Sequence, residues 1–252
     1  MPSIVASLLA LLLLAGCAGK STQHNILKQG EVHYEMGVDA LRKQNLPLAF
    51  RELLKAQSFL PDSAKVNAAL ALAWRYRGDL DRSAELYRRA LRIKSVPATH
   101  NNYGSLLLQR GRLQQAEKQF RMALDDPRYV RQDMVLINLG DLYAAQGRYD
   151  DAIASYRRAG LINPAQNISK LREAAAFIAS NRESYAEALL LTLLRQQPTS
   201  RAALEELLPL LQQHHNRAEA RRLLINYGDL SAQPSERGWA QQQLESVEGW
   251  HE

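Results

Sequence analysis

The sequence predicts an all-α fold, in which helix pairs stack side by side as an α-solenoid. Alanine and leucine are abundant and runs of β-branched residues are missing, which favours helices over strands. Three stretches also resemble one another: RGDLDRSAELYRRAL from Arg77, RGRLQQAEKQFRMAL from Arg110 and QGRYDDAIASYRRAG from Gln146. Self-similarity at a nearly fixed period is the signature of a repeat architecture.

The period of these stretches identifies the type of repeat. Gly78 and Gly111 are 33 residues apart, and Gly111 and Gly147 are 36 apart. The tetratricopeptide repeat, a helix–turn–helix unit, has a period of about 34 residues. Extending the register predicts about six such repeats over residues 30–234, with starts near 30, 64, 97, 133, 167 and 201. The expected stack is a right-handed superhelix.

Particular positions of the repeat carry particular kinds of side chain. The eighth position is small in the first five repeats: Gly37, Ala71, Gly104, Gly140 and Ala174. The twenty-fourth position is large throughout: Leu53, Tyr87, Phe120, Tyr156, Leu190 and Leu224. Two antiparallel helices that approach closely need a small residue where they cross, and a large neighbour fills the space beside it. The pattern therefore predicts a close helix crossing in each repeat.

The later part of the chain departs from the regular pattern at three places. Two extra residues lie around DDPRYVRQDM, which predicts a longer connection before the fourth repeat. In the sixth repeat Leu208 replaces the small residue and Pro209 falls inside the first helix, so that helix should be kinked or start late. Residues 235–252 should form a capping helix, about 235–247, and a tail, because terminal repeats are atypical.

The N-terminus has the features of a secretory signal. Residues 4–14 are almost wholly apolar, which is too short to cross a bilayer but matches an h-region, although the preceding MPS lacks the usual Lys or Arg. The sequence LAGC, ending at Cys17, resembles the lipobox of bacterial lipoproteins. The resemblance implies a signal peptide at 1–16, acylation (palmitate) of Cys17 and a lipidated polar tether at 17–29. The alternative is a structural cysteine in a short N-terminal helix.

The lipobox also implies a location. Aspartate directly after the cysteine favours retention at the inner membrane in such lipoproteins, and here the residue is Ala18. The expectation is a lipid-anchored protein of the outer membrane that faces the periplasm. Cys17 is the only cysteine, so acylation leaves no free thiol in an oxidising compartment. We expect no cofactor other than this covalent lipid.

Charge and motifs argue against nucleic-acid binding and catalysis. The net charge is +6, but the arginines occur as scattered pairs that fit a solvated helix face, and no nucleic-acid reader motif is present. No G-x-S-x-G, P-loop or H-E-x-x-H motif occurs. His214 and His215 are adjacent and lack metal-ligand spacing, so they should lie in a polar turn. We predict no enzyme, no metal site, no nucleic acid and no small-molecule substrate.

A concave groove remains as the candidate functional site. In tetratricopeptide repeats the first helix of each pair lines this groove, which could hold an extended or helical peptide. The candidate residues are Tyr34, Val38, Leu41 and Arg42 of repeat one, Lys65, Leu72, Arg75 and Tyr76 of repeat two, and Asn101, Ser105, Leu108 and Gln109 of repeat three. At the sixth position, Asn102 and Asn138 would bond a bound peptide or only the next helix. Some of these residues would instead pack against neighbouring helices.

The third repeat, NNYGSLLLQRGRLQQAEKQF, and the junction ALDDPRYVRQDMVLINLG add a more specific resemblance. Together with the lipobox and the repeats, they resemble the type IV pilus biogenesis and stability lipoproteins, the pilotins of the PilF/PilW type. The resemblance implies a scaffold that helps the pilus secretin, or another pilus assembly protein, to reach the outer membrane or multimerise there. The alternative is a repeat adaptor for cell-wall hydrolases or for outer-membrane protein assembly, which shares every feature except the NNYG repeat.

Overall fold

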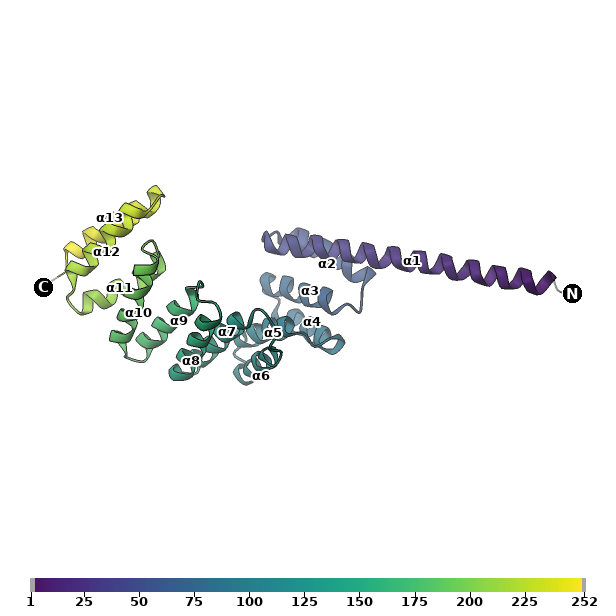
Figure 1. Ribbon diagram of the computed structural model, residues 1–252, viewed down its shortest axis with the longest axis horizontal. Helices are drawn as coiled ribbons and strands as arrows, with labels where there is room; N and C mark the ends of the chain where they lie inside the picture. Colours follow the sequence, from purple (N-terminus) through teal and green to yellow (C-terminus); the bar gives the residue numbers. More distant parts are fainter. Residues whose placement is uncertain (1–2, 251–252) are drawn as a thin grey trace. The chain divides into compact units, whose positions relative to one another are not determined.

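The structure is a computed structural model that describes residues 3–250, with side chains from residue 23 onward (Figure 1). Thirteen α-helices and no strand occur among these residues. The chain divides into two compact units, residues 1–127 and 128–252. Successive helices form packed pairs in both units. These findings confirm the predicted all-α solenoid of helix pairs.

Unit 1 contains the first three helix pairs. They are α1 (Ser3–Arg42) with α2 (Leu46–Phe59), α3 (Ala64–Arg77) with α4 (Leu80–Ile93), and α5 (Pro97–Gln109) with α6 (Leu113–Leu124). Helix α1 packs on both α2 and α3, and α3 also packs on α5. The first helices of the three pairs are therefore neighbours in space.

Unit 2 contains three further pairs and a final helix. They are α7 (Gln132–Ala145) with α8 (Tyr149–Ile162), α9 (Ile168–Ala179) with α10 (Glu183–Gln196), α11 (Arg201–Gln213) with α12 (Arg217–Leu230), and then α13 (Pro234–Glu248). Helix α13 packs on α12 and buries Ala240 and Val247. Its bounds agree with those expected for the capping helix.

The turn inside each pair contains one residue with a left-handed backbone. Its φ is +90° at Gly78, +68° at Gly111 and +72° at Gly147, which are the glycines that define the sequence repeat. The other such residues are Gln44 (φ +58°), Asn181 (φ +57°) and His215 (φ +54°). All six stand at the fifteenth position of their repeats. The backbone thus confirms the register in all six repeats, and it places His215 in the predicted turn.

These turns predict a reciprocal pair of substitutions. Gln44→Gly should stabilise the protein by up to about 1 kcal/mol, because a left-handed conformation costs a residue with a Cβ roughly 1–2 kcal/mol. Gly78→Gln should destabilise it by a similar amount, since a Cβ on Gly78 meets no atom within 4 Å and only the backbone opposes it. Urea unfolding of the two variants measures both changes. Equal stabilities would contradict this account of the turns.

The contact between the eighth and twenty-fourth positions explains the small residues of the pattern. A Cβ placed on Gly37 would lie 2.5 Å from Leu53 Cγ, and one on Gly140 would lie 2.4 Å from Tyr156 Cε1. Gly104 has the same relation to the ring of Phe120. The large side chain of the second helix therefore rests on the bare backbone of the first. This is the close crossing that the sequence predicted.

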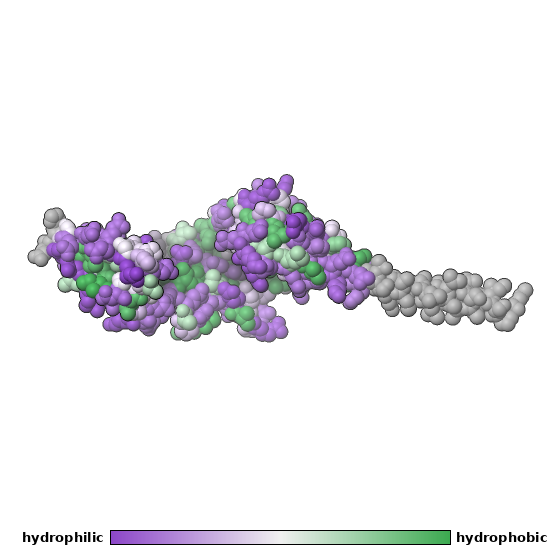
Figure 2. All heavy atoms as spheres, turned by 90° about the horizontal axis from the view of Figure 1, so that it is seen from above, coloured by the Kyte–Doolittle hydropathy of each residue, from purple (hydrophilic) through white to green (hydrophobic). Residues whose placement is uncertain are grey.

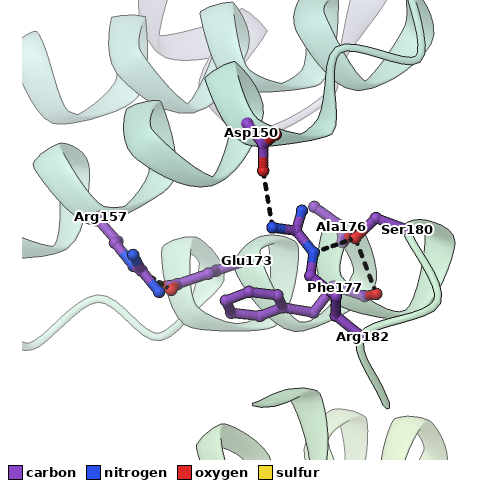
Figure 3. A network of polar contacts seen from close by, with 7 residues as sticks. All are labelled: Asp150, Arg157, Glu173, Ala176, Phe177, Ser180 and Arg182. Carbon is purple, nitrogen blue, oxygen red and sulfur yellow. Dashed lines mark hydrogen bonds and ion pairs between the residues drawn. The ribbon is translucent and has the colours of Figure 1, made fainter. Parts of the chain in front are cut away.

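Polar contacts join neighbouring repeats, as Figure 3 shows for the fourth and fifth. Arg182 Nη1 donates to Asp150 Oδ1 at 2.7 Å, and its Nε donates to Ser180 Oγ at 2.8 Å. Arg157 Nε donates to Glu173 Oε1 at 2.6 Å. Both guanidinium groups also lie over the ring of the buried Phe177. The fourth and fifth repeats are thus tied together by charge as well as by apolar packing.

Three expectations about the ends and connections have different outcomes. The backbone of residues 17–29, the expected tether, continues helix α1 without a break, so these residues span about 20 Å as a helix. The connection between α6 and α7, residues 125–131, is longer than the other connections, as predicted. Helix α11 begins at Arg201, in register, so the late start was wrong. Pro209 is accommodated inside it.

The predicted signal peptide and the side chain of Cys17 lie outside the residues whose side chains the structure describes. Within the described part, no helix combines the length and apolar character that a membrane crossing requires. On the face shown in Figure 2, the described residues are mainly hydrophilic, with hydrophobic residues interspersed among them. A contiguous apolar groove on such a surface is a candidate interaction site.

Candidate peptide-binding groove

A cavity of unit 1 has a volume of about 670 Å³ and is lined by α1, α3 and the beginning of α5. Eight of the predicted groove residues line it: Tyr34, Val38, Leu41, Arg42, Lys65, Leu72, Tyr76 and Asn102. They come from three helices because the first helices of successive repeats are neighbours. The structure therefore brings together the greater part of the predicted site, and we call this cavity the groove.

The other six predicted residues do not line the groove. Arg75 Nε donates to Gln109 Oε1 at 3.0 Å, and this bond joins α3 to α5. Ser105 Oγ donates to the backbone oxygen of Asn101 at 3.0 Å, within α5. Leu108 is half-buried on α5, and Asn138 belongs to α7 of unit 2. Arg75 and Gln109 thus act in stacking between repeats, which was the alternative for such residues.

Several lining residues were not predicted. Ala68 is the fifth residue of repeat two, the position that Tyr34 holds in repeat one, and Ala98 is the second residue of repeat three, the position that Lys65 holds in repeat two. The repeat register alone could therefore have identified both. Lys94 and Val96 lie in the connection before α5, where the register assigns no groove position. The remainder of the lining is Ser63, Ala64, Ala69 and Thr99.

The walls of the groove are apolar and aromatic in the middle. Three of the lining side chains are partly buried and pack against the core of unit 1: Tyr34, Val38 and Leu72. Lys65 Nζ lies 4.7 Å above the centre of the Tyr34 ring and pairs with Glu31. Tyr76 is 59% exposed, which is high for an aromatic side chain. Partly exposed aromatic residues of this kind commonly anchor protein interfaces.

A second cavity continues the groove beyond the ends of α1 and α3. It has a volume of about 470 Å³ and is lined by Leu41, Arg42, Gln44, Leu46 and Tyr76. Leu41, Arg42 and Tyr76 are shared with the groove. Since the two cavities share a wall, an occupant longer than the groove has a path along the surface.

The side-chain amide of Asn102 is among the groups of the groove that have no partner within the described residues. Asn102 is half-buried, and its side chain makes no hydrogen bond within the described residues. Its amide carries two donor hydrogens and an acceptor oxygen, so it can bond both polar groups of a peptide main chain. Asn102 thus fits the first of its two predicted roles, a bond to a bound peptide.

A buried carboxylate of α2 contacts α1, the helix that carries Tyr34. Glu52 of α2 is 2% exposed, and its carboxylate accepts from Arg51 Nε at 2.7 Å and contacts His33 Nδ1 at 2.7 Å. Arg51, and to a smaller extent His33, hold the pKa of Glu52 below its usual value by favouring the charged form. His33 precedes Tyr34, so this pairing orients the helix that presents the tyrosine.

His214 of unit 2 has a structural contact. His214 Nδ1 contacts Glu187 Oε2 at 2.7 Å, which joins the end of α11 to α10. Among the described residues, no group of three histidine, cysteine or carboxylate side chains is arranged to hold a metal ion.

Comparison with known proteins identifies the repeat. Residues 34–97 and 95–159 each match the tetratricopeptide repeat family, and together they span half of the chain. The chain belongs to the tetratricopeptide repeat family. Members of this family are protein-interaction scaffolds, and the six helix pairs and the groove of this tetratricopeptide repeat protein agree with that architecture.

Two sequence relatives cover part of this repeat protein. The type IV pilus assembly protein PilF of Pseudomonas aeruginosa is 31% identical over 135 residues, which are 50% of this chain and 53% of that protein. An uncharacterized protein of Haemophilus influenzae is 26% identical over 122 residues, which are 48% of this chain and 68% of that protein. The match to PilF thus spans about half of its length.

Solved structures share the fold over most of the chain. The structure of Pseudomonas aeruginosa PilF aligns with a TM-score of 0.70 and 21% identity, covering 87% of this chain and 99% of that one. The crystal structure of PilW, a type IV pilus biogenesis factor, aligns with a TM-score of 0.73 and 20% identity, covering 86% and 97%. The fold is therefore similar to that of PilF and PilW.

Proposed function

We propose that this repeat protein is an outer-membrane lipoprotein that serves as a scaffold in type IV pilus assembly. The observation that carries the proposal is the groove, built by repeats one to three on a fold similar to that of PilF and PilW. Type IV pilus assembly is proposed as the process because one sequence relative is the type IV pilus assembly protein PilF. The proposed partner is a segment of the pilus secretin, which the protein helps to localise or multimerise.

The proposed mechanism is tethering without catalysis. Lipid on Cys17 would hold the protein at the periplasmic face of the outer membrane, while the groove holds a secretin segment. Confining both proteins to one surface raises the effective concentration of secretin subunits for one another. The scaffold would need no enzymatic step, because multimerisation requires only that the subunits meet in the right place.

The lipid anchor predicts two different outcomes for neighbouring residues. Cys17→Ala should take up no labelled palmitate and should be absent from the outer-membrane fraction, because stable anchoring depends on the acyl chains. Ala18→Asp should still be labelled but should stay at the inner membrane, as the lipoprotein resemblance implies. Membrane fractionation with palmitate labelling measures both. Normal labelling and location of Cys17→Ala would show that Cys17 is a structural residue.

Co-purification distinguishes the proposed partner from the alternative. The lipidated protein should be extracted from outer membranes in mild detergent after cross-linking, and its partners identified by mass spectrometry. Enrichment of the pilus secretin supports the proposal. Enrichment of a cell-wall hydrolase or of an outer-membrane assembly protein, without the secretin, would favour the adaptor instead.

A further inference from the structure

The groove is positively charged as well as apolar. Three of its lining residues are cations, Arg42, Lys65 and Lys94, and none of its lining residues is a carboxylate. An apolar groove with cations at its edge favours an occupant that combines apolar and acidic side chains, by charge complementarity.

The cations lie at both ends of the groove. Glu31 of α1 pairs with Lys65 at the start of α3, whereas Arg42 at the end of α1 shares a cavity wall with Tyr76 near the end of α3. Helices α1 and α3 therefore run parallel. Lys65 is the second residue of α3 and Lys94 lies just before α5, so these two lysines stand where two helices begin.

The beginnings of α3 and α5 add to the positive potential of that end. A helix N-terminus carries roughly half a positive charge from its unpaired N–H groups. The α5 terminus has no side-chain cap, and its residues Ala98 and Thr99 line the groove. A carboxylate at this end would meet two lysines and two helix dipoles together.

Two of the three cations are not neutralised by the protein. Arg42 and Lys94 make no ion pair with any side chain that the structure describes. Lys65 shares its charge with Glu31. An incoming carboxylate therefore gains an attraction without having to break an existing pair at Arg42 or Lys94.

The net positive charge of the chain is concentrated in unit 1, the unit that contains the groove. Residues 1–127 carry 18 lysines and arginines against 11 aspartates and glutamates, a net charge of +7. Residues 128–252 carry 14 against 15, a net charge of −1. The whole excess of positive charge is thus in the unit that contains the groove, where it would attract an acidic segment over a distance.

We infer that the groove binds an acidic apolar peptide segment of its partner, with a carboxylate side chain seated where α3 and α5 begin and a second one near Arg42. The inference rests on the proposed function, because it names the chemistry of the segment that the groove would hold. The apolar part of the segment lies over Val38 and Leu72, and Asn102 bonds its main chain. A bilayer surface is the competing source of negative charge, but its flat face does not fill a concave apolar cavity.

The test uses the lipidated full-length protein in detergent and three labelled peptides. The peptides share a Leu-Phe-Ala-Leu core that is flanked by glutamates, by glutamines or by lysines. Fluorescence anisotropy at low salt should show the glutamate-flanked peptide binding about tenfold tighter than the glutamine-flanked one, and the lysine-flanked peptide weakest. Arg42→Gln and Lys94→Gln should each reduce this preference by about threefold, which is typical of one exposed charge pair.

A matched control separates the groove from the general charge of unit 1. Arg88→Gln with Arg92→Gln removes two exposed charges from α4 outside the groove. This double variant should keep the full preference for the glutamate-flanked peptide. Equal affinity for the three peptides, no binding of any of them, or an equal loss in the control would overturn the inference. A further outcome would also overturn it. If Arg42→Gln and Lys94→Gln keep the full preference for the glutamate-flanked peptide and only bind phosphatidylglycerol vesicles more weakly, these cations contact a lipid surface and not a peptide.

The two proposals fail in different experiments. If the peptides show no charge preference but removal of the groove side chains abolishes secretin multimers, only the acidic chemistry is wrong. If the preference is found and secretin multimers form normally without this protein, the groove binds an acidic segment of a different partner.

Discussion

Gly140→Ala is expected to destabilise unit 2 by about 1–3 kcal/mol, the usual range for adding an atom to a packed core. The new Cβ would lie 2.4 Å from Tyr156 Cε1 and 2.7 Å from its Cδ1. The tyrosine ring cannot easily move away, because it is 2% exposed and its hydroxyl donates to Asp141 Oδ1 at 2.8 Å. The loss should exceed the roughly 1 kcal/mol that alanine gains over glycine in helix propensity.

The same substitution at another glycine provides the control. A Cβ on Gly238 of α13 meets no atom within 4 Å, so Gly238→Ala should be neutral or stabilising by up to about 1 kcal/mol. Thermal and urea unfolding followed by circular dichroism compare the two variants. If Gly140→Ala is as stable as the parent protein, the close crossing of α7 and α8 is not what requires glycine there.

Combined replacement of Tyr34, Leu72 and Tyr76 by alanine should abolish detergent-resistant secretin multimers in cells. These side chains form the apolar and aromatic wall of the groove. A few buried aromatic anchors commonly account for about 2 kcal/mol or more each at an interface, so the loss of three should remove most of the affinity. Unboiled gel electrophoresis of outer membranes, followed by immunoblotting of the secretin, measures the result.

Two controls keep this experiment interpretable. Leu54→Ala, Leu161→Ala and Tyr185→Ala remove exposed apolar side chains that do not line the groove, and they should leave the multimers intact. Tyr34 and Leu72 also pack on the core, so the amount of protein and its thermal midpoint must be compared. Tyr76→Ala alone should lower the multimers without unfolding, because Tyr76 is 59% exposed. Normal multimers in the folded triple variant would show that the groove is not the secretin site.

The repeat register could be predicted from the sequence because two physical constraints recur in it. The small eighth residue and the large twenty-fourth residue are visible wherever the helices cross, as at Gly104 and Phe120. The left-handed turn is visible only where glycine occupies it. Gln44 and His215 adopt the same conformation with a Cβ. Packing of the surrounding helices imposes the turn there, so no local signal marks it.

The groove could be predicted in part for a similar reason. Residues at regular positions of the first helices, such as Val38 and Leu72, follow from the period. Lys94 and Val96 do not, because they lie in a connection whose path depends on how α4 and α5 pack. Arg75 satisfies the position rule and still bonds Gln109 instead of facing the cavity. A long flexible side chain can reach several partners, and which of them it bonds depends on the three-dimensional structure.

The most direct test of the central proposal is the state of the pilus secretin in a strain that lacks this protein. Outer membranes are isolated and run without boiling, so that multimers and monomers separate. The proposal predicts that the multimers are lost, return with the parent gene and fail to return with Cys17→Ala. Multimers that persist at the parent level in the deletion strain would contradict a role in secretin assembly.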